Sequence, residues 1–536
     1  MNNSSTSKQL NLSKIAFIFV LLAYLIYAGV YIYKTSFVDD GERYFLLFDD
    51  AMISMRYARN LVNGDGLVFN PGGERVEGFT NPLWVVFMAF FHLFPIPAAK
   101  ISLAIQISGA LLLALNLLVV QKIGEELSGN SWIALLGTAL TAFYYPLNVW
   151  GLYGMEVSAL VLLVGWAALL TLRAFRSGEF SVAPYLILGI GTFVRVDMVV
   201  PYVVVLAFLA TTDPLHRSKH LRWGLGILAA SLGMQTLLRF WYYGDLLPNT
   251  YHLKLAGIPL LVRVGHGLLV FFKFAWNFNW ALFLGGFLIF LFRRDRFVTL
   301  LAALFLAQIA YSIYVGGDAW EDKGGANRYI ATAIPMFFIL FVLSFDRVKE
   351  ALLQAIKGRQ ITQRALNLGL AAFVLGSMLN FNALLDTRSL TKWALRSQPL
   401  FVAGNIEYTH ISLALQKFTT ENASIAVVTA GVIPYLTDLY TVDLLGKNDA
   451  VIAHLPSRTA TGLSLLADFR PGHSKWDYDY SIGQLQPDVI VQLWGDTEEA
   501  RAYIDQYYTI VEIDGMTFSV RSDSPNILWD QVTVLP

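Results

Sequence analysis

The chain has 536 residues, of which 56% are hydrophobic, 14% aromatic and only 15% charged, whereas an ordinary soluble protein carries about 25% charged residues. The 39 basic residues balance the 39 acidic ones, and the chain contains no cysteine. This composition excludes intrinsic disorder, nucleic-acid binding through a basic surface, disulfides and cysteine chemistry, and it disfavours a soluble enzyme. With a mean hydropathy of +0.53, it predicts a polytopic membrane protein.

Eleven apolar runs are candidates for membrane-spanning helices, each of which needs about 20 residues. The first, residues 14–33, follows Lys8 and Lys14 and lacks a small-residue cleavage site. We therefore predict an uncleaved helix that starts in the cytoplasm. The other runs are 101–121, 131–149, 155–173, 181–195, 197–211, 222–242, 279–293, 297–315, 329–345 and 366–384.

The stretch 181–211 fits either one long helix or a tight pair. A pair places all the basic connectors on the side of the N-terminus, as the positive-inside rule requires, so we predict the pair. An odd number of spans then puts the C-terminus outside the cytoplasm.

The outer side receives the segments 34–100, 243–278 and 316–328, which are rich in acids, glycines, prolines and aromatics. Within the first of them, residues 82–94 are too short to span a membrane and predict an interfacial or re-entrant helix. A true span there would invert every later segment and break the charge rule.

The composition changes after about residue 385. The runs that begin at Ser424 and Pro487 and the segments YTIVEI and MTFSVRS predict strands, and HISLALQKFTTE and DTEEARAYIDQYY predict helices. We therefore expect a transmembrane catalytic domain over 1–384 and a soluble, extracytoplasmic α/β domain over 385–536. The chain has neither a G-x-G-x-x-G fingerprint nor a P-loop.

The strongest chemical signal is the adjacent pair Asp49 and Asp50, which follows the run YFLLF in the first outer loop. Adjacent carboxylates at a membrane boundary are costly unless they are solvated, paired or functional. One of them can serve as a general base towards a hydroxyl group, and the two together can hold a divalent cation such as Mg, Mn or Ca. The alternative is an N-cap or acidic first turn of the helix AMISMRYARNLV.

The same loop offers three further candidates. Arg56 and Arg59 lie three residues apart on that helix, where they can contact a phosphate, pair with acids or form an exposed face. Glu77 lies in a turn-rich segment and can contact sugar hydroxyls, although a solvated loop explains it equally well.

Two more groups of polar residues interrupt or follow apolar runs. Arg195 and Asp197 stand in an apolar stretch, where the arginine either binds a phosphate or forms a structural ion pair. Asp245, Asn249 and Lys254 cluster where a helix emerges outside, and Lys254 can neutralise a phosphate.

Asp318 and Arg328 flank a glycine-rich outer loop, with interfacial anchoring as the alternative. All of these groups fall on one predicted side of the membrane. That placement suits a lipid phosphate whose tail lies in the bilayer and whose headgroup lies at the outer surface.

The segment DDAMISMRYARNLVNGDGLVFNPGGERVEGFTNPLW is similar to the first periplasmic loop of a family of membrane glycosyltransferases, those related to the terminal β-(1→2) arabinofuranosyltransferase of the actinobacterial cell wall. The segments RVD, YYGDLLPNTYHLK, GGDAWEDKGGANRY, VDLLGKNDAVIA and PGHSKWDYDY follow in the expected order. Met52 and Met55 stand where the family has aromatics.

The resemblance implies the GT-C fold and transfer of a sugar such as arabinofuranose from a polyprenyl phosphate donor to a cell-envelope glycan acceptor outside a bacterial inner membrane. It implies that Asp49 or Asp50 is the catalytic base of an inverting reaction, and that Arg195, Lys254, Arg328 and Arg56 are candidates for the donor phosphate. Arg59, Glu77, Asp245, Asn249 and Asp318 remain candidates for substrate contact. A protein O-mannosyltransferase, a lipid A aminoarabinose transferase and, in another class, a lipid flippase are the alternatives.

Overall fold

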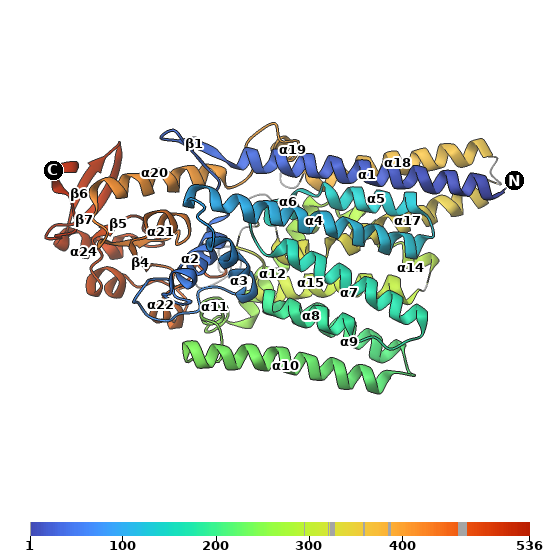
Figure 1. Ribbon diagram of the computed structural model, residues 1–536, viewed down its shortest axis with the longest axis horizontal. Coiled ribbons are helices and arrows are strands. Elements are labelled where there is room, and N and C mark those ends of the chain that lie inside the picture. Colours follow the sequence, from blue (N-terminus) through green and yellow to red (C-terminus); the bar gives the residue numbers. More distant parts are fainter. Residues whose placement is uncertain are drawn as a thin grey trace. The chain divides into compact units, whose positions relative to one another are not determined.

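A computed structural model describes residues 2–293, 295–319, 321, 327–356, 360–383, 387–458 and 469–536 (Figure 1). The chain forms two compact units. We name residues 1–34, 106–234 and 264–400 the helical unit, and residues 35–105, 235–263 and 401–536 the mixed unit. The first outer loop thus belongs to the same unit as the C-terminal tail, whereas the linear boundary at 384/385 stays a prediction.

Helices make up the helical unit, and four of them (α1, α4, α10 and α12) include residues of the mixed unit. Their bounds are α1 Asn2–Thr35, α4 Ala98–Ser128, α5 Ser131–Ala142, α6 Tyr145–Leu152, α7 Val157–Ser177, α8 Ala183–Val194, η1 Val196–Met198, α9 Val199–Thr212, α10 Arg217–Tyr243, α12 Leu260–Asn277, α13 Trp280–Gly285, α14 Ile289–Phe292, α15 Arg296–Val315, α16 Arg328–Ala331, α17 Ile334–Ala355, α18 Gln360–Asn382 and α19 Thr387–Trp393.

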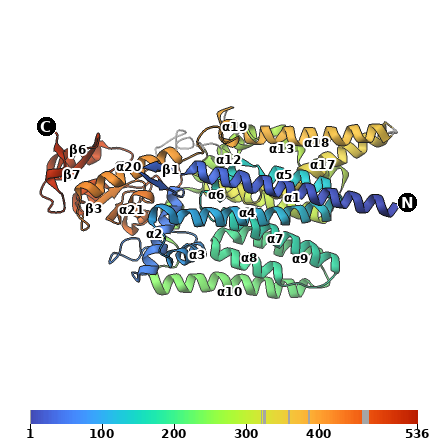
Figure 2. The same ribbon diagram turned by 45° about the horizontal axis from the view of Figure 1, so that its top comes forward.

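Within the described residues, five helices are long and apolar enough to cross a membrane, or seven if each of two bent helix pairs counts as one span. The prediction of eleven spans therefore stays open. The stretch 181–211 does form two helices, α8 and α9, separated by the short η1. Figures 1 and 2 show α7, α8 and α9 side by side.

Prolines and polar residues explain where the helices differ in extent from the predicted runs. The expected run 131–149 is broken into α5 and α6, bent by 58°, because Pro146 lacks an N–H group and instead starts a new helix. Pro335 likewise starts α17, which extends to Ala355 through a charged segment that hydropathy alone does not recognise as helix.

The segments on either side of residue 279 also differ from the prediction. The expected outer loop 243–278 contains the helix α12, whose Arg263, His266 and Lys273 lower its apolar character. The expected span 279–293 consists of the short helices α13 and α14, and together with α12 it bends by 90°.

The mixed unit begins with a hairpin of β1 Phe37–Asp39 and β2 Glu42–Tyr44. Asp40 and Gly41 form its two-residue turn with positive φ angles of 45° and 77°, as hairpin turns require. The helices α2 Asp49–Asn63 and α3 Pro82–His92 follow. α3 confirms that residues 82–94 contain a helix too short to span a membrane.

The tail contains a six-stranded sheet with strand order β4-β3-β5-β7-β6-β8. The pairs β3–β4 and β3–β5 are parallel, and the other pairs are antiparallel. The strands and helices predicted from the tail sequence are confirmed. The elements of the mixed unit that follow α3 are α11 Asn249–Lys254, α20 Val402–Phe418, β3 Ser424–Val427, α21 Val432–Thr437, β4 Tyr440–Asp443, α22 Ala450–His454, η3 Asp479–Gln484, β5 Val489–Ile490, α24 Glu498–Tyr507, β6 Tyr508–Ile513, β7 Met516–Arg521, η4 Trp529–Gln531 and β8 Thr533–Val534.

Candidate active site

Asp49 and Asp50 form the first turn of α2. The residue at the N-cap position is Phe48, and no side chain caps this end. The N-cap form of the alternative interpretation is therefore wrong, whereas its acidic first turn is confirmed. Oδ1 of Asp49 instead accepts a hydrogen bond of 2.9 Å from the backbone N–H of Val432, which lies in the tail. The tail approaches so closely that a Cβ atom on Gly431 would lie 2.0 Å from the carbonyl oxygen of Asp49.

The environment of Asp49 disfavours its charged form. Burial raises the pKa of Asp49 to about 7, and the neighbouring charge of Asp50 acts in the same direction. The Val432 N–H and the ammonium group of Lys447 act against this shift. A carboxyl group with a pKa near 7 is suited to accept a proton at neutral pH.

Asp50 has a different environment. Its Oδ1 lies 2.9 Å from Nζ of Lys447, and about a fifth of each side chain is exposed. The partly buried ring of His473 lies in the field of Asp50, which favours the charged ring, and of Lys254, which disfavours it; burial lowers the pKa of His473 to about 4. Lys447 and His473 are thus part of this site, and sequence reasoning missed both, although they lie in the two tail segments that carry the family resemblance.

Arg56 is fully buried and is held by acceptors of the protein itself. Nε donates to the carbonyl oxygen of Phe69 at 2.6 Å, Nη1 donates to that of Pro434, and Nη2 donates to those of Leu439 and of the Asn70 side chain. These donors join α2 to the tail, and the phosphate-binding role of Arg56 stays a prediction.

Arg59 and Glu77 also pair within the mixed unit. Arg59 donates to the carbonyl oxygen of Tyr435 at 2.8 Å and forms an ion pair with Asp438. Buried Glu77 accepts from the guanidinium group of Arg239. Glu77 is therefore not the solvated loop residue of the alternative interpretation, and Arg59 forms the pairing with an acid that was one of its predicted possibilities.

The three predicted residues that follow α10, namely Asp245, Asn249 and Lys254, have different contacts. The amide of Asn249 donates to the carbonyl oxygens of Gly446 and Lys447, each at 3.0 Å, which ties α11 to the segment that carries Lys447. Asp245 lies 3.1 Å from Nε2 of His252. The stem of half-buried Lys254 packs near Gly472, where an added Cβ would lie 3.2 Å from Cε of the lysine.

The ionisable residues of the helical unit form a buried network of their own. Arg195 donates to both carboxylate oxygens of Asp197, at 2.7 and 2.6 Å, and to Glu156 at 2.9 Å. The structural ion pair was the alternative interpretation of Arg195, and it is what the structure shows. One guanidinium group between two carboxylates leaves a local negative charge, which does not favour a phosphate.

Arg328 and Asp318, predicted to contact substrate separately, form a bidentate ion pair. Nε and Nη2 of Arg328 lie 2.9 Å from the two carboxylate oxygens of Asp318, and the carboxylate also accepts from the backbone N–H of Arg328. Both residues are buried, so the interpretation of Arg328 as an interfacial anchor is wrong.

Comparisons with known proteins identify the fold. A family model described as a domain of unknown function (DUF8728) matches residues 401–527, and no curated protein matches the chain. The structure is similar to that of ArnT from Cupriavidus metallidurans, with 12% sequence identity, over 95% of this chain and 98% of that chain, at a TM-score of 0.56 in the apo state and 0.54 when bound to undecaprenyl phosphate.

It is also similar to the archaeal oligosaccharyltransferase AglB from Archaeoglobus fulgidus in complex with an inhibitory peptide and a dolichol-phosphate. The identity is 12%, the coverage is 98% of this chain and 76% of that chain, and the TM-score is 0.54. The chain is a polytopic helical membrane protein with the GT-C fold and a C-terminal sheet domain.

Proposed function

We propose that this chain is an inverting glycosyltransferase that takes a sugar from a polyprenyl phosphate donor and uses Asp49 as its general base. The observation that carries this proposal is the environment of Asp49, which burial and Asp50 hold at a pKa of about 7. The fold supports the donor class, because ArnT and AglB have been described with undecaprenyl phosphate and dolichol-phosphate bound.

The reaction is a single displacement. The acceptor hydroxyl group gives its proton to the carboxylate of Asp49, and its oxygen forms a bond to the anomeric carbon of the sugar. The bond from that carbon to the phosphate oxygen breaks, and the polyprenyl phosphate leaves with the electron pair. A phosphate leaving group needs little protonation, so one carboxylate suffices, whereas glycosidases use two.

Asp50 and Lys447 support this base rather than replace it. Asp50 is paired with Lys447, so its carboxylate is the weaker candidate for taking the proton. Lys254 is the candidate for neutralising the donor phosphate, because its stem packs near Gly472 and its charge acts on His473, as the charge of Asp50 does. The charges of Lys254 and Asp50 both act on the pKa of His473, which supports a shared site in the mixed unit.

The position of the reaction follows from the charge pattern of the connectors. We propose that the N-terminus lies in the cytoplasm and the tail lies outside a bacterial inner membrane. The acceptor is then an extracytoplasmic cell-envelope glycan, and the sugar suggested by the family resemblance is arabinofuranose.

The test is sugar transfer from radiolabelled polyprenyl phosphate sugars to envelope glycans by the purified full-length protein. Wild type is compared with Asp49→Asn, Asp50→Asn and the control Asp65→Asn, in which an exposed aspartate of the same loop is neutralised. We expect Asp49→Asn to lose about 10²- to 10⁴-fold in rate, the usual contribution of a general base. Asp50→Asn should lose less, and Asp65→Asn should match wild type.

Two results would overturn the proposal. Transfer that survives in Asp49→Asn and disappears in Asp50→Asn would exchange the two roles. Failure of wild type to transfer any polyprenyl-linked sugar, although the folded protein binds the lipid, would indicate a lipid flippase instead.

A further inference from the structure

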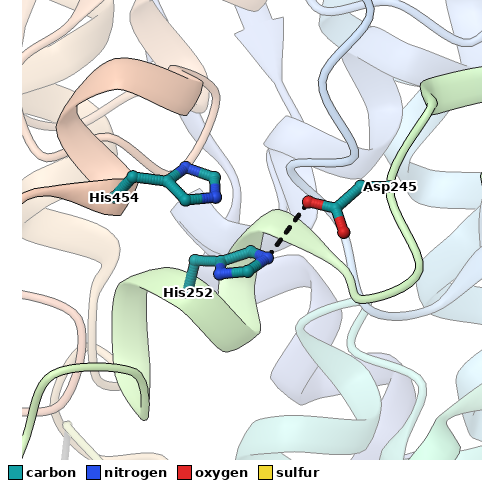
Figure 3. A group of neighbouring side chains, drawn as sticks. All are labelled: Asp245, His252 and His454. Atoms are coloured by element: carbon teal, nitrogen blue, oxygen red, sulfur yellow. Dashed lines mark hydrogen bonds and ion pairs between the residues drawn. The ribbon is translucent and has the colours of Figure 1, made fainter.

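Three potential metal ligands meet on one side of the mixed unit, namely Asp245, His252 and His454 (Figure 3). One ligand atom from each lies within 4.8 Å of the other two. Asp245 precedes α11, His252 lies on α11, and His454 ends α22. Asp49 and Asp50 are not part of any comparable group of three among the described residues.

The contacts around these side chains suit metal ligation. Nδ1 of His454 lies 2.7 Å from the carbonyl oxygen of Ala450. A carbonyl only accepts, so Nδ1 carries the proton and Nε2 of the neutral ring presents its lone pair. Oδ1 of Asp245 accepts from the backbone N–H of Leu247 at 3.1 Å. Such outer contacts orient the ligands of metal sites.

The two imidazole rings are already together. Their centroids are 4.0 Å apart with an angle of 30° between their planes, and Nε2 of His252 lies 3.1 Å from Oδ2 of Asp245. His454 is exposed, so an ion and its waters can reach the ring from solvent. Two nitrogens and one oxygen are ligands that zinc-class cations prefer over Mg²⁺ or Ca²⁺.

The backbone beneath the ligands is fixed by two buried side chains. Nζ of Lys475 donates to the carbonyl oxygens of His252 at 3.0 Å, Ala256 at 3.2 Å and Ala453 at 2.9 Å. At the other end of α11, Asn249 holds Gly446 and Lys447. These contacts join α11 to the segment 446–454 independently of any ion, so the three ligands are held close before one binds.

We propose that Asp245, His252 and His454 bind one zinc-class divalent cation, with water in the remaining coordination position. Binding displaces the hydrogen bond between His252 and Asp245, and the neutral imidazole of His252 then carries its proton on Nδ1 while Nε2 contacts the ion. The ion braces α11 against the segment that carries Lys447, the partner of Asp50. The site is separate from the proposed base, and the proposal does not depend on glycosyl transfer.

The test uses the full-length protein in detergent, stripped with a chelator and then titrated with Zn²⁺. Bound metal is counted by elemental analysis, affinity is measured by calorimetry, and the absorption spectrum of the Co²⁺-loaded protein reports nitrogen and oxygen coordination. The variants are His454→Asn, Asp245→Asn and the control His410→Asn, which changes an exposed histidine paired with Asp39. Size-exclusion elution confirms that each variant is folded.

We expect one Zn²⁺ per wild-type chain, with affinity at least about tenfold weaker in His454→Asn and Asp245→Asn and unchanged in His410→Asn. Metal also raises the melting temperature of wild type but not that of His454→Asn. Absence of Zn²⁺ binding by wild type, or equal binding in all variants, would overturn the proposal. Loss of the ion in Asp50→Asn with retention in His454→Asn would place the metal at the aspartate pair instead.

Discussion

Nζ of Lys447 lies 2.9 Å from Oδ1 of Asp50, although the two residues are 397 positions apart in the chain. The tail therefore supplies a cation to the acidic pair of the first outer loop. That cation also opposes the upward shift in the pKa of Asp49. The tail is thus part of the electrostatic environment of the proposed base.

Removal of this cation should shift the pH dependence of transfer. Wild-type kcat/KM should fall about tenfold per pH unit below pH 7, because Asp49 acts only when ionised and its pKa is about 7. Lys447→Met raises that pKa further, so the acidic limb should move to higher pH and activity should recover at pH 9. The pH profile of kcat/KM measures the shift. Lys447→Arg should keep the wild-type profile. Lys417→Met, which removes an exposed lysine paired with Asp514, should keep it too. An unshifted profile in Lys447→Met would contradict the assignment of Asp49 as the base.

Asp49 should also reduce the stability of the folded protein at alkaline pH. Its folded-state pKa of about 7 exceeds its ordinary value of 3.8, so between these values the folded state binds more protons than the unfolded state. Stability from this group is therefore full below about pH 4 and is lost as the pH rises to 7. Asp49→Asn should show a higher melting temperature than wild type at pH 8 and a smaller difference at pH 5. A difference that is the same at both pH values would show that the pKa of Asp49 is not raised.

The sequence predicted what depends on local pattern and missed what depends on distant contacts. The strands of the tail and the helix pair α8 and α9 follow from periodicity and charge. Spacing on α2, however, does not distinguish Arg56, which is buried against the tail, from Arg59, which is partly exposed. Lys447 lacked any local signal as a partner of Asp50, because hundreds of residues separate them.

Arg56 should contribute to folding rather than to binding of a phosphate. Arg56→Met removes the donors to the carbonyl oxygens of Phe69, Pro434 and Leu439, and each buried acceptor left unsatisfied costs about 1–3 kcal/mol. We expect Arg56→Met to have a much lower melting temperature than wild type and to be cleaved faster by proteases in the first outer loop and in the tail. Arg501→Met, which breaks an exposed ion pair with Glu498, is the control and should match wild type. A stable Arg56→Met that has lost only affinity for the lipid donor would support the phosphate-binding role.

Arg195 should stabilise the helical unit through its buried ion pairs rather than bind the donor phosphate. Arg195→Met leaves buried Glu156 and Asp197 without their guanidinium partner, and breaking a buried ion pair in this way costs about 3–5 kcal/mol. Neutralising both acids as well, in Arg195→Met/Glu156→Gln/Asp197→Asn, removes the uncompensated charges and should recover most of the melting temperature. Arg173→Met, which loses an exposed pairing with Glu126, should have little effect. Thermal unfolding of the detergent-solubilised variants distinguishes the roles. If Arg195 instead contacts the donor phosphate, Arg195→Met should be stable and should bind the donor more weakly. The charge-neutral triple variant would then not restore donor binding.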